Sequence, residues 1–124
     1  MNSRLLLVLA GLLGAAGVAA AAAASHVPGG AMLASGAELL LVHAAALLGL
    51  AALAERRRER GRLVLVLIGI VMAIGAGLFA GDMAARVFHG QGLFPYAAPT
   101  GGSSLIGAWI VLALASAVGS IRAE

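Results

Sequence analysis

Four ionisable side chains interrupt stretches that are otherwise apolar, and these residues are the best placed in the chain to do chemistry. Glu38 and His43 lie within one apolar run, whereas Asp82 and Arg86 lie at the end of another. Inside a membrane helix such groups are rare, and they typically move protons or ions or pair with one another. Arg86 follows Asp82 by four residues, so the spacing places both on one helical face and predicts an ion pair.

His43 has three interpretations. The simplest is a neutral imidazole that is hydrogen-bonded to a neighbouring helix. The alternatives are a proton relay and a haem or metal ligand. Glu38 lies about 7 to 8 Å further along the helix and about 140° around it, so the two side chains do not share a face. His26 and His89 are expected at other depths, which makes a metal or haem site the weakest alternative, and no cofactor is predicted.

Motifs that would indicate an enzyme are missing from the sequence. It contains no phosphate-binding GxxxxGK[ST] loop, no HExxH zinc motif and no GxSxG nucleophile motif. There is no cysteine, which excludes a thiolate nucleophile and a cysteine-ligated metal. The sequence therefore predicts a protein that is not an enzyme.

The composition shows what must position these side chains. Hydrophobic residues make up 62% of the 124 positions and charged residues only 10%, with a mean hydropathy of +1.06. A membrane-crossing helix needs about 20 mainly apolar residues, and four segments approach this requirement. The sequence predicts an all-α membrane protein whose single domain (1–124) is one bundle of four helices at about 4–24, 37–54, 63–83 and 104–121.

A dense group of arginines predicts the orientation of this bundle. Five of the eight basic residues lie between the second and third helices: Arg56, Arg57, Arg58, Arg60 and Arg62. Short arginine-rich loops stay on the cytoplasmic side of a membrane, so both termini are expected inside. Arg4 and Arg122 then also lie inside. Residues 1–24 also have some features of a cleaved signal peptide, although the apolar stretch is long for one. No aromatic residues are interleaved with the arginines, and no nucleic-acid partner is predicted.

On the opposite, outer side the topology gathers a polar layer that contains His26, Glu38, Asp82 and Arg86. The same side holds Pro99-Thr100-Gly101-Gly102-Ser103-Ser104, which we interpret as a tight turn into a capped helix N-terminus. Free backbone N–H groups there could receive the Glu38 or Asp82 carboxylate or a lipid phosphate.

Four blocks of the chain resemble the DUF423 family of small bacterial membrane proteins, whose eukaryotic relatives are called transmembrane protein 256. The first helix ends in a block similar to the family's Gly-Ala-His, and a second block is similar to its G-x-E-Y-Q-x-x-H-A segment. The third and fourth resemble its L-F-S-G and P-x-G-G-x-x-F-x-x-G-W blocks. In this chain they are Ala23-Ala24-Ser25-His26, Gly36-Ala37-Glu38 with Val42-His43-Ala44, Leu78-Phe79-Ala80-Gly81, and Pro99-Thr100-Gly101-Gly102 with Ser104 and Trp109.

The chain departs from the family pattern at Leu39-Leu40, where the family has Tyr-Gln, and at Asp82, Leu105 and Gly107. The resemblance implies four helices in the bacterial inner membrane and brings no known activity. The first functional hypothesis is a non-catalytic accessory or assembly subunit of a larger energy-converting membrane complex. Its expected partners are the lipid bilayer and other membrane subunits or a second copy. The alternative is a small transporter or proton conductor that uses His43, Glu38 and Asp82.

Overall fold

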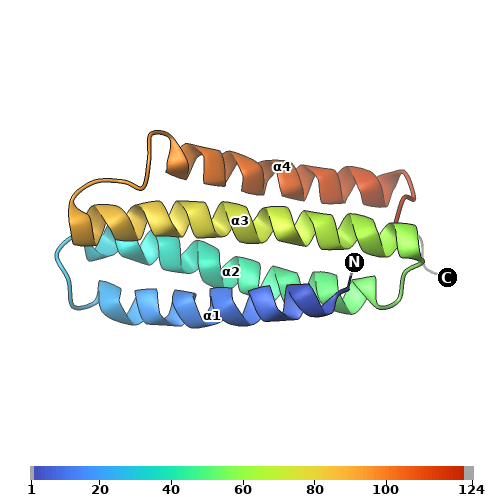
Figure 1. Cartoon of the computed structure of the whole chain (residues 1–124), viewed down its shortest axis with the longest axis horizontal. Helices are drawn as coiled ribbons and strands as arrows, with labels where there is room; N and C mark the ends of the chain where they lie inside the picture. The colour runs from blue at the N-terminus through green and yellow to red at the C-terminus, as the bar shows by residue number, and fades with distance from the viewer. Residues whose placement is uncertain (1, 122–124) are drawn as a thin grey trace.

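The computed structural model describes residues 2–121 and confirms an all-α protein. Its helices are α1 (Arg4–Ala24), α2 (Gly30–Ala54), α3 (Glu59–His89) and α4 (Ala97–Ala117). Successive helices run in opposite directions (Figure 1). Each of the four is long and apolar enough to cross a membrane, and alanine and leucine, which dominate them, are strong helix formers.

Three of the helices extend beyond the predicted bounds. The first matches its prediction, but α2 begins seven residues before the expected start at position 37, and α3 adds residues at both ends. The fourth begins at Ala97 rather than near 104 and ends at Ala117 rather than 121. Gly36, which lies just outside the predicted second helix, and Gly101 and Gly102, which were interpreted as a turn, are all helical. Pro99 is tolerated because it is the third residue of α4, where a backbone N–H has no partner within the helix.

The four helices form an unevenly packed bundle. Figure 1 shows α3 in the middle, with α4 on one side and α1 on the other. The second helix packs between α1 and α3. Among the described residues, the backbone of α4 lies against α3 alone. The result is a three-helix core to which α4 is added along one face of α3.

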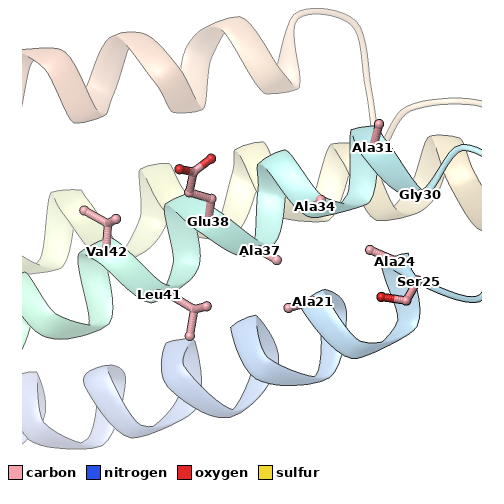
Figure 2. A pocket seen from close by; sticks show the side chains of 10 residues that line it. All are labelled: Ala21, Ala24, Ser25, Gly30, Ala31, Ala34, Ala37, Glu38, Leu41 and Val42. Atoms are coloured by element: carbon pink, nitrogen blue, oxygen red, sulfur yellow. The ribbon is translucent and has the colours of Figure 1, made fainter.

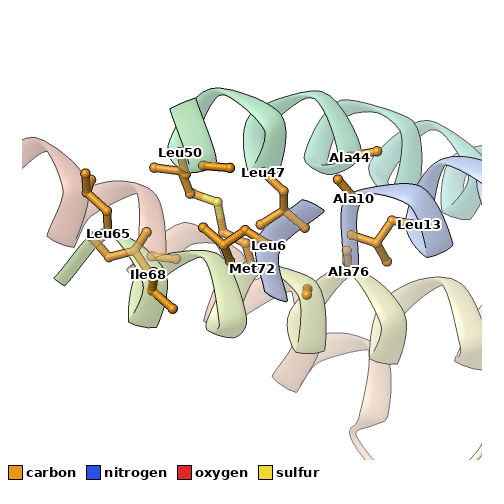
Figure 3. Close-up of a cluster of buried hydrophobic side chains, with 14 of the residues drawn as sticks. Leu6, Ala10, Leu13, Ala44, Leu47, Leu50, Leu65, Ile68, Met72 and Ala76 are labelled. Carbon is orange, nitrogen blue, oxygen red and sulfur yellow. The ribbon is translucent and has the colours of Figure 1, made fainter. Parts of the chain in front are cut away.

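Most of the core lies where α1, α2 and α3 meet, and α4 adds Leu105 and Ala108 to it. Leu6, Leu47 and Met72 are fully buried and turn toward one another (Figure 3). Between helices in lipid, close packing rather than removal of apolar surface from water stabilises such a cluster. This packing holds the three helices in register and so fixes the level of every polar group they carry.

The two ends of the bundle differ in charge. Arg56, Arg57 and Arg58 lie in the loop between α2 and α3, whereas Arg60 and Arg62, also predicted there, lie in the first turn of α3. The first and last described residues lie at this same end of the bundle (Figure 1). There the Ser3 hydroxyl donates a hydrogen bond to the Glu55 carboxylate. Arg4 lies at this end too, as predicted, whereas Arg122 is outside the described residues. The opposite end holds the loops 25–29 and 90–96, and this is the end where the predicted polar residues gather.

Candidate functional site

Asp82 is the most buried charged residue among those described. It lies on α3 and its side chain is fully buried. Both carboxylate oxygens accept hydrogen bonds. Oδ2 accepts a hydrogen bond from Nε of Arg86 at 2.8 Å, which confirms the predicted ion pair. Oδ1 accepts one from the backbone N–H of Leu93 at 2.9 Å. Asp82 therefore fastens the loop 90–96 back onto α3.

Gly92 makes this attachment possible. A Cβ atom at position 92 would overlap the Asp82 carboxylate and would lie 3.1 Å from a terminal nitrogen of Arg86. The next residue, Leu93, packs its side chain over Gly81 of α3. The loop thus lies along the helix rather than extending away from it, and only a residue without a side chain fits directly above Asp82.

His43 joins α2 to α4. The residue is only 3% exposed, with Nδ1 2.7 Å from the backbone oxygen of Leu39 and Nε2 3.1 Å from Nε1 of Trp109. An indole N–H can only donate, so Nε2 accepts, and Nδ1–H donates to the carbonyl. The ring is therefore a neutral imidazole with both nitrogens occupied. The predicted hydrogen bond to a neighbouring helix is confirmed, with Trp109 as the partner.

Glu38 differs from both of these residues. It borders a groove of about 530 Å³ between α1 and α2, where it is the one charged side chain in a lining of small and apolar residues. The carboxylate projects from the side of α2 that faces away from α1 (Figure 2). It is exposed, and no hydrogen bond or ion pair joins it to another described residue.

Glu38 also lies further from the start of its helix than the sequence suggested. The prediction placed it at the outer end of its helix, but α2 begins at Gly30. Glu38 is eight residues from that start, or about 12 Å along the axis. Asp82 is similarly seven residues from the end of α3 at His89. Both carboxylates are therefore held within their helices rather than at the ends.

The interpretation of Gly101 and Gly102 as a tight turn is wrong. Both lie inside α4, whose N-cap is Tyr96, with no side-chain capping hydrogen bond. Gly101 instead sits where α4 crosses α3, since a Cβ atom there would lie 2.6 Å from the backbone oxygen of Gly75. The expected contact of the α4 N-terminus with Asp82 is also absent, because that carboxylate bonds to Arg86 and Leu93.

The remaining histidines stay apart from this site. His26 follows α1 and is exposed, and His89 is the last residue of α3 and is exposed too. Within residues 2–121, no three His, Cys, Asp or Glu side chains gather closely enough to hold a metal ion. Asp82 and His43 are therefore each fully hydrogen-bonded to neighbouring segments, whereas the Glu38 carboxylate has no partner among the described residues.

Four residues that make these contacts were not predicted to do so. Leu93 contributes only its backbone N–H, and Gly92 matters because it has no side chain. Neither contribution can be recognised from the residue type in the sequence. Gly75 was one glycine among 18. Trp109 had a signal, because it is the one tryptophan of the chain and buried indole N–H groups usually find an acceptor.

Comparison with known proteins gives one match. A family model described as "Protein of unknown function (DUF423)" matches residues 10–102. This range is most of the chain and includes Glu38, His43, Asp82 and Arg86, and it ends before Trp109. No curated protein and no solved structure matches. The match over most of the chain, with the four apolar helices, shows that the protein belongs to the DUF423 family.

Proposed function

We propose that this protein is a non-catalytic accessory or assembly subunit of a larger membrane complex, with an energy-converting complex as the favoured class. The observation that carries the proposal is Glu38. An ionisable side chain within a membrane-spanning helix is costly unless it is paired, and the described chain pairs Asp82 and His43 but offers Glu38 nothing. A partner from another molecule would supply what the chain lacks.

The distribution of buried residues supports a role within the bilayer. Only 17% of the residues in the most apolar window of α1 or of α4 are buried, against 44% in α2 and 50% in α3. The loops 25–29, 55–58 and 90–96 are short, so little of the described chain extends beyond the helices. A protein of this shape has most of its available contact surface facing other membrane components.

The same geometry favours this proposal over proton conduction. A relay needs groups that are free to accept and release a proton along a path. Both ring nitrogens of His43 are engaged, and so are both carboxylate oxygens of Asp82. Of the three residues that the alternative requires, only Glu38 is free.

We propose further that the protein is a multi-pass protein of the bacterial inner membrane with its arginine-rich end in the cytoplasm. Arg4 and the loop arginines lie at one end of the bundle, and Arg86 lies toward the other, as the positive-inside rule favours. An alkaline phosphatase domain inserted at residues 56–58 is expected to be inactive, and one inserted at residues 26–28 active. The reverse pattern would refute the orientation.

The proposed role predicts how the protein behaves after gentle extraction. Tagged protein solubilised from its native membranes in a mild detergent should migrate on a native gel well above its own 12.2 kDa. Because the unpaired carboxylate is expected to hold the partner, Glu38→Gln should weaken this association about fivefold or more. The matched control is Glu59→Gln, which removes an exposed carboxylate at the arginine-rich end. A small species alone in every mild detergent would rule out the role.

A further inference from the structure

A continuous exposed stripe runs along α2, and its first four members also line the edge of the groove between α1 and α2. Its members are spaced three or four residues apart, which places them on one face of a helix. All are exposed, and Figure 2 shows Ala31, Glu38 and Val42 on the side that turns away from α1. We call this stripe the α2 seam: Ala31, Ala34, Glu38, Val42, Ala45, Gly49 and Ala52.

The seam is shallow and uncovered. Apart from Glu38, only Val42 in it has a side chain larger than a methyl group. A Cβ atom at Gly49 would meet no other atom within 4 Å, so nothing in the described chain lies over the seam there. The exposed face of α4 is different, because it carries the large side chains of Ile106, Ile110 and Leu114. Small residues let two helix backbones approach closely in a membrane. The small residues of the α2 seam would allow another helix to pack closely against α2.

The single charge in the seam indicates what the neighbour carries. Glu38 needs a hydrogen-bond donor or a cation when lipid surrounds it, and the other seam residues are apolar. We propose that the α2 seam is the docking surface for a membrane helix of another protein that presents a lysine or arginine at the level of Glu38. The inference rests on the proposed function, and it adds the surface and the chemistry of the partner.

Charge argues against a second copy of this chain in the same place. Two copies inserted in the membrane with the same orientation are related by a two-fold axis along the membrane normal, so a symmetric dimer through the seam would place both Glu38 carboxylates at one level, close to that axis. The next arginine along the chain after Glu38 is Arg56, which lies 18 residues further on, in the loop after α2, at a helical rise of about 27 Å. It cannot neutralise the pair, so the occupant should differ from this chain.

A designed membrane helix tests the chemistry. The probe is a Leu/Ala helix with one lysine level with Glu38, and its control has leucine at that position. Both are mixed with the full-length protein in phosphatidylcholine vesicles, and their association is measured by energy transfer. The lysine helix is expected to bind about tenfold more tightly than the control, and Glu38→Gln should remove the difference. Equal binding of the two helices would overturn the proposal.

Two glycines test the location. Gly49, in the seam, and Gly11, on α1, are both exposed and have open space where a Cβ would be, so leucine is a matched substitution at the two sites. Gly49→Leu is expected to weaken binding of the lysine helix about tenfold, whereas Gly11→Leu should leave it unchanged. Equal effects of the two substitutions, or energy transfer between copies of the protein that Gly49→Leu abolishes, would refute the proposed occupant of the seam.

The failure of this inference can be separated from that of the proposed function. If the protein migrates in a large native complex that Gly49→Leu leaves intact, the seam is not the docking surface and the accessory role stands. If the unsubstituted protein migrates alone, the accessory role itself fails.

Discussion

Gly101→Ala is expected to destabilise the protein by about 2 to 3 kcal/mol, because the added Cβ atom would meet the backbone of α3. It would lie 2.6 Å from the carbonyl oxygen of Gly75 and 2.8 Å from the backbone nitrogen of Phe79. Neither atom can rotate away, as a side chain could. Relief therefore requires α4 to move away from α3, which is the one helix that its backbone contacts among the described residues.

Helix propensity acts in the opposite direction, and its size shows which effect dominates. Alanine favours a helix over glycine by about 1 kcal/mol, which is less than the strain expected from overpacking at a backbone contact. The next residue separates the two effects. A Cβ atom at Gly102 meets nothing within 4 Å, so Gly102→Ala carries the propensity gain without the clash.

Unfolding of both variants in a mild detergent provides the measurement. Gly101→Ala should unfold at lower denaturant concentration than the unsubstituted protein, and Gly102→Ala at the same or a higher concentration. The fluorescence of Trp109 gives a second readout, because displacement of α4 would break its hydrogen bond to His43. If the two alanine variants unfold alike, the contact between α3 and α4 at this point is not what the structure shows.

The sequence predicted features that depend on local spacing. Hydropathy indicates the four membrane helices, because about 20 apolar residues are needed for each crossing. The four-residue step from Asp82 to Arg86 was enough to predict their ion pair. His43 could be assigned a hydrogen bond, because a buried imidazole needs one.

Contacts between residues far apart in the sequence could not be predicted from local residue spacing. Trp109 is 66 residues from His43, and their meeting requires α2 and α4 to lie in register on α3. Gly101 was interpreted as a turn residue because glycine disfavours isolated helices. In the structure its missing side chain serves the helix crossing, which no local pattern reveals.

The helix ends were missed for a related reason. The second helix was predicted to start only after Gly36, yet Gly36 is where α2 approaches α3, and a Cβ there would lie 3.1 Å from the Cα atom of Ala80. Packing against a neighbouring helix outweighs an unfavourable local preference. Because α2 extends further, Glu38 moves from a helix end to a position within the helix, which is what makes its lack of a partner significant.

Asp82→Ala is expected to release the loop 90–96 from α3 and to lower the melting temperature of the protein by about 5 to 10 °C. The substitution leaves the Leu93 N–H without its acceptor and removes the ion-pair partner of the half-exposed Arg86 guanidinium. A donor that loses its partner inside a protein is more destabilising than a hydrogen bond that was never formed. Asp82→Asn should have a smaller effect, because an amide oxygen can still accept from Leu93 although the charge facing Arg86 is lost.

Hydrogen exchange reports this change where it occurs. In Asp82→Ala the backbone amide of Leu93 should exchange about tenfold faster or more, whereas amides in the centre of α3 should change little. Glu38→Ala is the matched control, since it removes an exposed carboxylate from a neighbouring helix and should leave both the Leu93 exchange rate and the melting temperature of the isolated protein unchanged. If Asp82→Ala behaved like this control, Asp82 would not be what holds the loop. Its burial would then require another explanation, such as direct contact with a ligand or partner.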